Sequence, residues 1–113
     1  MTSRLTSAMQ ASLLIRRVSG EGGMAMILAK GDETAGGLLL ATREKGRNSG
    51  LYERILCSDG QYLWQRVGPQ DIDGETETDL YIQRRCAFDP DLWVIELDIP
   101  NAERFAAEIT AAT

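Results

Sequence analysis

Residues 89–99 read DPDLWVIELDI, and this stretch indicates the fold more clearly than any other part of the chain. An Asp-Pro-Asp turn opens it, and the residues that follow alternate with the period of two that is typical of a β-strand. We therefore predict a strand over 92–99 whose main apolar face packs against the first helix. The residues on that face are Trp93, Ile95, Leu97 and Ile99.

Outward from this strand, the chain divides into eight short elements in the order α-β-β-β-β-α-β-α. Ser7 and Gln10 fit a capping box that begins a first helix, and turn signals rich in Gly, Asp and Asn separate the later elements. The predicted helices cover 7–19, about 76–87 and a last short segment capped by Asn101. The predicted strands cover 24–29, 38–43, 51–57, 61–67 and 92–99.

A chain of 113 residues is long enough for one domain and too short for two, so we expect a single domain over 1–113. The element order predicts an α+β fold with a mostly antiparallel sheet of about five strands and helices packed on one face. The segment 24–29 reads MAMILA, and this continuous apolar run predicts a buried strand.

Large apolar side chains also occur on the second face of the predicted sheet, which would be exposed if the helices covered one side only. Leu92 and Val94 lie opposite the Trp93 face, and Tyr62 and Trp64 share one face of the predicted hairpin. These four residues form a candidate interface for a homodimer or a protein partner. A loop near 69–75 that folds over this face is the alternative.

Composition excludes several kinds of chemistry. The chain has no histidine, and its two cysteines, Cys57 and Cys86, lie far apart without further thiols. Zinc sites and imidazole-based catalysis are therefore disfavoured, and we expect no metal, no cofactor and two free thiols in a cytoplasmic protein. No apolar run is long enough to span a membrane. The net charge is −5, which disfavours a nucleic-acid partner.

Four charged residues at the ends of predicted elements form a candidate site for a small anionic ligand or an enzyme substrate. They are Arg17, Asp32, Arg85 and Asp89. Arginine suits bidentate contacts with carboxylate or phosphate groups. Helix-end charges and turn aspartates explain the same positions without a ligand. No catalytic constellation is recognisable, so the sequence favours a protein that is not an enzyme.

Three segments carry a family likeness: Leu14 to Val18, Gly31 to Leu40, and above all Phe88 to Glu96. Through them the chain resembles the small bacterial domain-of-unknown-function family fourteen-ninety-one (DUF1491). The likeness spans most of the chain and is weaker over residues 46–75. It implies a compact bacterial cytoplasmic α+β domain, and it implies no activity and no functional residues.

The leading hypothesis from the sequence is a small cytoplasmic domain that acts through association with itself or with a protein partner. The second hypothesis is the anionic-ligand site. A third hypothesis is single-stranded nucleic-acid binding by Tyr62, Trp64, Arg54 and Arg66, because aromatic and basic residues are interleaved there. The acidic total makes this the weakest of the three.

Overall fold

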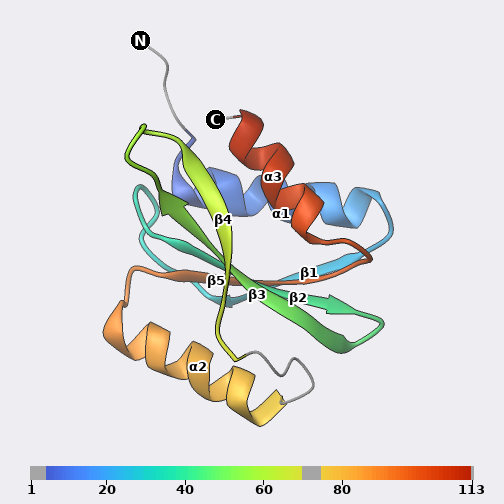
Figure 1. The fold of residues 1–113 in the computed structure, drawn as a ribbon. Coiled ribbons are helices and arrows are strands. Elements are labelled where there is room, and N and C mark those ends of the chain that lie inside the picture. The colour runs from blue at the N-terminus through green and yellow to red at the C-terminus, as the bar shows by residue number, and fades with distance from the viewer. Residues whose placement is uncertain (1–4, 70–74, 113) are drawn as a thin grey trace.

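The predicted strand at 92–99 is the second strand of a five-stranded sheet with the order β1-β5-β2-β3-β4. The computed structural model describes residues 5–69 and 75–112, and Figure 1 shows their arrangement. The strands are β1 (Met24–Ala29), β2 (Leu38–Glu44), β3 (Arg47–Leu56), β4 (Tyr62–Val67) and β5 (Trp93–Asp98). The helices are α1 (Ser7–Gly20), α2 (Glu75–Phe88) and α3 (Glu103–Ala112). The predicted α+β class and element order are confirmed.

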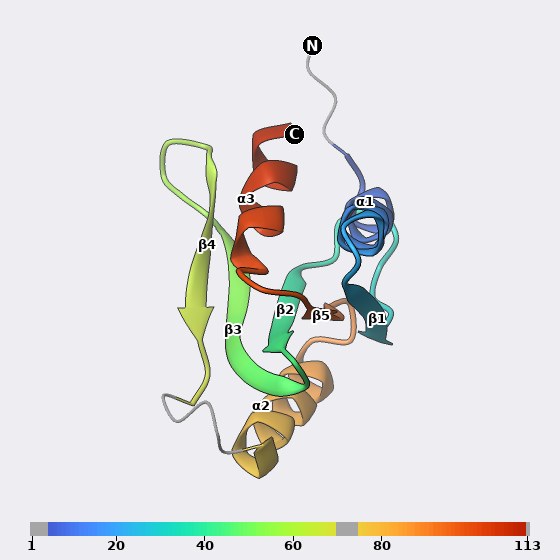
Figure 2. The ribbon, with the colours of Figure 1, turned by 90° about the vertical axis from the view of Figure 1, so that its right-hand side faces the viewer.

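The sheet is mixed, and one of its pairings is parallel. β5 runs parallel to β2 and antiparallel to β1, so it separates the first two strands of the chain. The other pairings, β2 with β3 and β3 with β4, are antiparallel. The expectation of a mostly antiparallel sheet is therefore confirmed, and β1 and β4 are its two edges (Figure 2).

The helices cover both faces of the sheet, so the prediction that they lie on one face is wrong (Figure 1). α1 and α3 pack on the face that carries Trp93, Ile95 and Leu97, as predicted for this strand. α2 covers the opposite face, where Leu39, Leu92 and Val94 are fully or almost fully buried. The second apolar face is explained by a third layer that belongs to the same chain.

The largest difference in an element boundary and a difference in one capping residue both have local causes. β3 begins at Arg47 because the turn after β2 needs only Lys45 and Gly46, which both have positive φ angles of 54° and 79°. This is the geometry of a tight two-residue hairpin turn. α1 is capped by Thr6 instead of Ser7, since the Thr6 hydroxyl accepts a hydrogen bond from the Met9 amide at 3.2 Å.

The loop over residues 31–37 packs closely against the turn that precedes β5 and is hydrogen-bonded to it. The Trp93 indole Nε1 donates to the Asp32 carbonyl at 2.7 Å, and the Asp32 amide donates to the Asp91 carbonyl at 3.0 Å. A Cβ on Gly31 or on Gly36 would lie 2.1 Å from that Asp91 oxygen. Both positions therefore have to be glycine for the two segments to meet.

Truncating Trp93 tests this core. Trp93 is 3% exposed, so Trp93→Ala should lower the free energy of unfolding by about 3–5 kcal/mol. Trp93→Phe keeps a ring and removes the indole donor, and it should cost about 1–3 kcal/mol. Denaturant titration measures both. The control is Leu56→Ala, because Leu56 is 60% exposed. An unchanged melting temperature for Trp93→Ala would contradict the assignment.

Adding one methyl group tests the glycine contact. Gly36→Ala should destabilise the fold by on the order of 1–3 kcal/mol, because the new Cβ meets backbone that cannot move aside freely. Gly20→Ala is the matched control, since a Cβ at Gly20 meets nothing within 4 Å. Thermal unfolding of the two variants should show a lower midpoint for Gly36→Ala only.

Candidate functional site

Asp32 and Asp89 are two of the four predicted ligand residues. Asp32 lies in the loop over residues 31–37, and Asp89 lies in the neighbouring turn before β5. The Asp32 Oδ2 accepts hydrogen bonds from the amides of Thr34 and Ala35 at 3.1 and 2.9 Å. The Asp89 Oδ1 accepts one from the Asp91 amide at 3.1 Å. Both carboxylates therefore stabilise turns in their own loops, which is a common role of aspartate.

The two arginines of the predicted ligand site lie on opposite sides of the sheet. Arg17 of α1 forms an exposed ion pair with Glu108 of α3. Arg85 of α2 makes a bidentate pair with Glu53 of β3, with N–O distances of 2.6 and 2.7 Å. The hydrogen bond to Glu53 raises the pKa of Arg85, against the opposing effect of partial burial. The structure thus does not bring the four residues into one site.

The predicted interface residues are also divided between the two faces. Leu92 and Val94 are buried in the cluster under α2. Trp64 packs against the other cluster, the one covered by α1 and α3. Tyr62 shares the face of Trp64, because the two side chains are two positions apart on β4. The four residues therefore form no single surface, and the grouping made from the sequence is wrong.

Three of the four residues in the nucleic-acid hypothesis, Tyr62, Trp64 and Arg54, make contacts within the protein. The Arg54 guanidinium lies 4.4 Å from the centre of the Tyr62 ring and also donates to the Gln10 side chain. Trp64 packs on the core cluster. Nucleic-acid bases would need these same rings and this guanidinium for stacking. The contacts within the protein therefore disfavour the nucleic-acid hypothesis.

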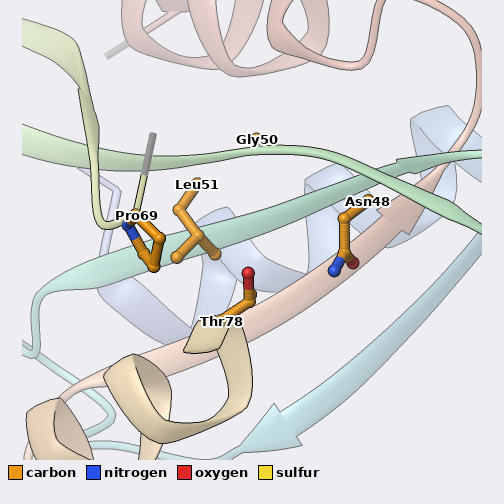
Figure 3. A pocket seen from close by; sticks show the side chains of 5 residues that line it. All are labelled: Asn48, Gly50, Leu51, Pro69 and Thr78. Carbon is orange, nitrogen blue, oxygen red and sulfur yellow. The ribbon is translucent and has the colours of Figure 1, made fainter. Parts of the chain in front are cut away.

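A small hollow separates β3 from the start of α2 (Figure 3). Leu51 and Thr78 point into it, and Asn48, Gly50 and Pro69 complete its lining. Its volume is about 10 Å³, which holds about one water molecule and no larger ligand. Residues 70–74, which include the acids Asp71 and Asp73 and most of the predicted covering loop, lie outside the described residues.

Two further features concern metals and redox state. The described residues include no cluster of three or more His, Cys, Asp or Glu side chains that could hold a metal ion. Cys57 follows directly after β3 and Cys86 lies on α2, and both are free thiols.

No helix among the described residues combines the length and the apolar character needed to cross a membrane.

The most unusual surface of the molecule is β1, which the sequence pattern predicted to be buried. That prediction is wrong, because β1 is an edge strand that pairs only with β5 among the described elements. Its apolar side chains stay exposed on both faces of the sheet. The exposed fractions are 73% for Met24, 54% for Met26, 42% for Ile27 and 45% for Leu28. We call this strand and its exposed side chains the β1 edge.

The two edges of the sheet differ in polarity. β1 contains no charged side chain, whereas β4 contains Arg66 and Gln65. Natural edge strands usually carry charges, prolines or strong bulges that prevent pairing with other chains. β1 has one irregularity, between Ile27 and Ala29, and its other side pairs with no strand in the part of the chain that the structure describes. The MAMILA run was the available signal, but a run of this kind does not distinguish a central strand from an edge strand.

Removing each predicted ligand arginine tests its structural role. Arg85→Met should cost on the order of 1–3 kcal/mol of unfolding free energy, because it leaves the Glu53 carboxylate without its bidentate partner. Arg17→Met is the control and should cost less than about 1 kcal/mol, since the Arg17 and Glu108 side chains are 54% and 44% exposed. Equal costs in chemical denaturation would contradict this difference.

Comparisons with known proteins agree with this architecture. A crystal structure of a DUF1491 family protein from Caulobacter crescentus is 29% identical, with a TM-score of 0.77 over 89% of this chain and 94% of that one. An NMR structure of a family protein from the same organism is 28% identical, with a TM-score of 0.78 over 92% and 94%. The solution structure of protein Atu0922 from A. tumefaciens is 32% identical, with a TM-score of 0.68 over 88% and 89%.

The curated proteins give no match to this chain. The family model described as a protein of unknown function, DUF1491, matches residues 5–107. The residues that carried the likeness in the sequence, including Phe88 to Glu96, lie within this range. Because the match covers nearly the whole chain, the protein belongs to the DUF1491 family.

Proposed function

We propose that this protein is a non-enzymatic cytoplasmic association domain, and that it binds a polypeptide by adding an extended strand to the β1 edge. The observation that carries the proposal is the exposure of four large apolar side chains on an uncharged edge strand. In strand addition, main-chain hydrogen bonds supply affinity and the alternating side chains supply specificity. β1 offers both kinds of contact at once.

The size of the exposed surface supports this role. The four exposed fractions together equal about two fully exposed residues, divided between the two faces of the sheet. Exposed apolar side chains that cluster on a monomeric protein often mark an interaction site. Methionine is also enriched at protein interfaces, and two of the four side chains are Met24 and Met26.

The contacts of the charged residues favour association over catalysis. The carboxylates of Asp32 and Asp89 accept hydrogen bonds from their own loops, and Arg17 and Arg85 each pair with a glutamate on a neighbouring element. A small anionic ligand would need several of these groups to converge. The free thiols of Cys57 and Cys86 fit the reducing conditions of a cytoplasm.

Site-specific photo-crosslinking tests the proposal. A benzophenone amino acid at position 26 should crosslink to a polypeptide in cells of the organism that encodes the protein, because Met26 lies in the middle of the β1 edge. The same amino acid at position 63 is the control, since Leu63 is 55% exposed on the opposite edge strand. A crosslinked polypeptide that depends on position 26 supports the proposal. Absence of any polypeptide at position 26, or equal labelling from position 63, contradicts it.

A further inference from the structure

We infer that the polypeptide bound at the β1 edge is a second copy of this chain. The two β1 strands pair antiparallel around a two-fold axis near Met26, so that the two five-stranded sheets become one continuous sheet. This inference rests on the proposed function, because it uses the same edge, and it adds the identity of the partner.

The first argument is that β1 is complementary to itself. An axis of this kind brings the same surface of both copies together. β1 meets this condition, because no charge lies between Met24 and Ala29 and apolar side chains are exposed on both faces. A chain with a net charge of −5 repels its own copy over much of its surface. The uncharged strand brings no like charges into the contact.

The second argument is the charge at the two ends of the strand. The exposed pair Glu21–Arg104 lies beside the start of β1, with an N–O distance of 3.0 Å. The exposed pair Lys30–Glu33 lies just after its end, with an N–O distance of 3.7 Å. Antiparallel pairing places the first pair of one copy beside the second pair of the other. Lys30 can then meet the second copy's Glu21, and Glu33 can meet its Arg104.

The third argument concerns the centre of the contact. The pairing of β1 with β5 shifts register between Ile27 and Ala29, so Leu28 is an extra residue at which the edge bends. The regular part of the edge therefore runs from Met24 to Ile27. A symmetric ladder built on this part has its axis near its middle, which is why we place it close to Met26.

The small exposed area of the β1 edge limits the expected affinity of the dimer. Four partly exposed side chains from each copy bury less area than the roughly 1,200 Å² or more that is typical of stable interfaces. α1 packs over β1 and lies next to the edge on one face of the sheet (Figure 2). We therefore expect a weak, reversible dimer.

Sedimentation equilibrium from about 10 μM to 1 mM tests the inference on the full chain. The average mass of the wild type should rise from 12.5 kDa toward twice that value. Met26→Lys should weaken association at least tenfold, because it places like charges together near the axis. Leu63→Lys is the matched control and should associate like the wild type. Both side chains are about half exposed, so both variants should keep the fold, which circular dichroism verifies.

A mixture provides a second measurement that does not depend on one variant. Met26→Lys and Met26→Glu should each be monomeric alone and should associate when mixed, since opposite charges then meet near the axis. Failure of the mixture to associate would overturn the pairing around Met26. A wild type that stays monomeric at 1 mM, or a dimer that Leu63→Lys disrupts and Met26→Lys does not, would overturn the second copy as the partner.

The two proposals fail in different ways. If the wild type is monomeric but position 26 still crosslinks to another protein in cells, the second copy is wrong and the association function stands. If position 26 crosslinks to nothing and the protein is monomeric, both are wrong.

Discussion

The carbonyl of Asp91 is the point on which the arrangement of the sheet depends. It accepts a hydrogen bond from the Asp32 amide while Gly31 and Gly36 pack directly against it. The neighbouring indole of Trp93 reaches back to the Asp32 carbonyl. The same loop also binds the first turn of α1, because Ser7 donates its hydroxyl to the Gly36 carbonyl at 2.6 Å. A loop, a helix start and a strand start are therefore fixed together.

The contacts between the loop over residues 31–37 and the turn before β5 explain why β5 lies between β1 and β2. The loop over residues 31–37 joins β1 to β2 and the turn leads into β5, so β1 ends at the place in the sheet where β2 and β5 begin. With β5 inserted there, β1 is left at the edge with one paired side. The exposed apolar strand on which the proposed function rests is thus a consequence of the same contact that buries Trp93.

The charged residues have a structural role in this fold. Arg85 connects α2 to β3 through Glu53. Arg43 of β2 pairs with Glu96 of β5 at 2.6 Å and with Glu75 of α2 at 3.2 Å. Partial burial alone would lower the pKa of Arg43, but its hydrogen bonds and charge interactions with these two glutamates raise it. In this chain without histidine, ion pairs between arginine and glutamate connect α2 to the sheet.

The sequence by itself determined the elements, their order and the α+β class, because these follow from local periodicity and turn residues. The alternation over 92–99 also assigned Trp93, Ile95 and Leu97 correctly to one buried face. Periodicity identifies which side chains share a face, but it does not say which strands become neighbours. That is set by contacts between distant residues, such as Asp32 with Asp91, which have no local pattern. Tertiary structure alone therefore decided that α2 covers Leu92 and Val94, that Arg17 and Arg85 lie apart, and that β1 is an exposed edge.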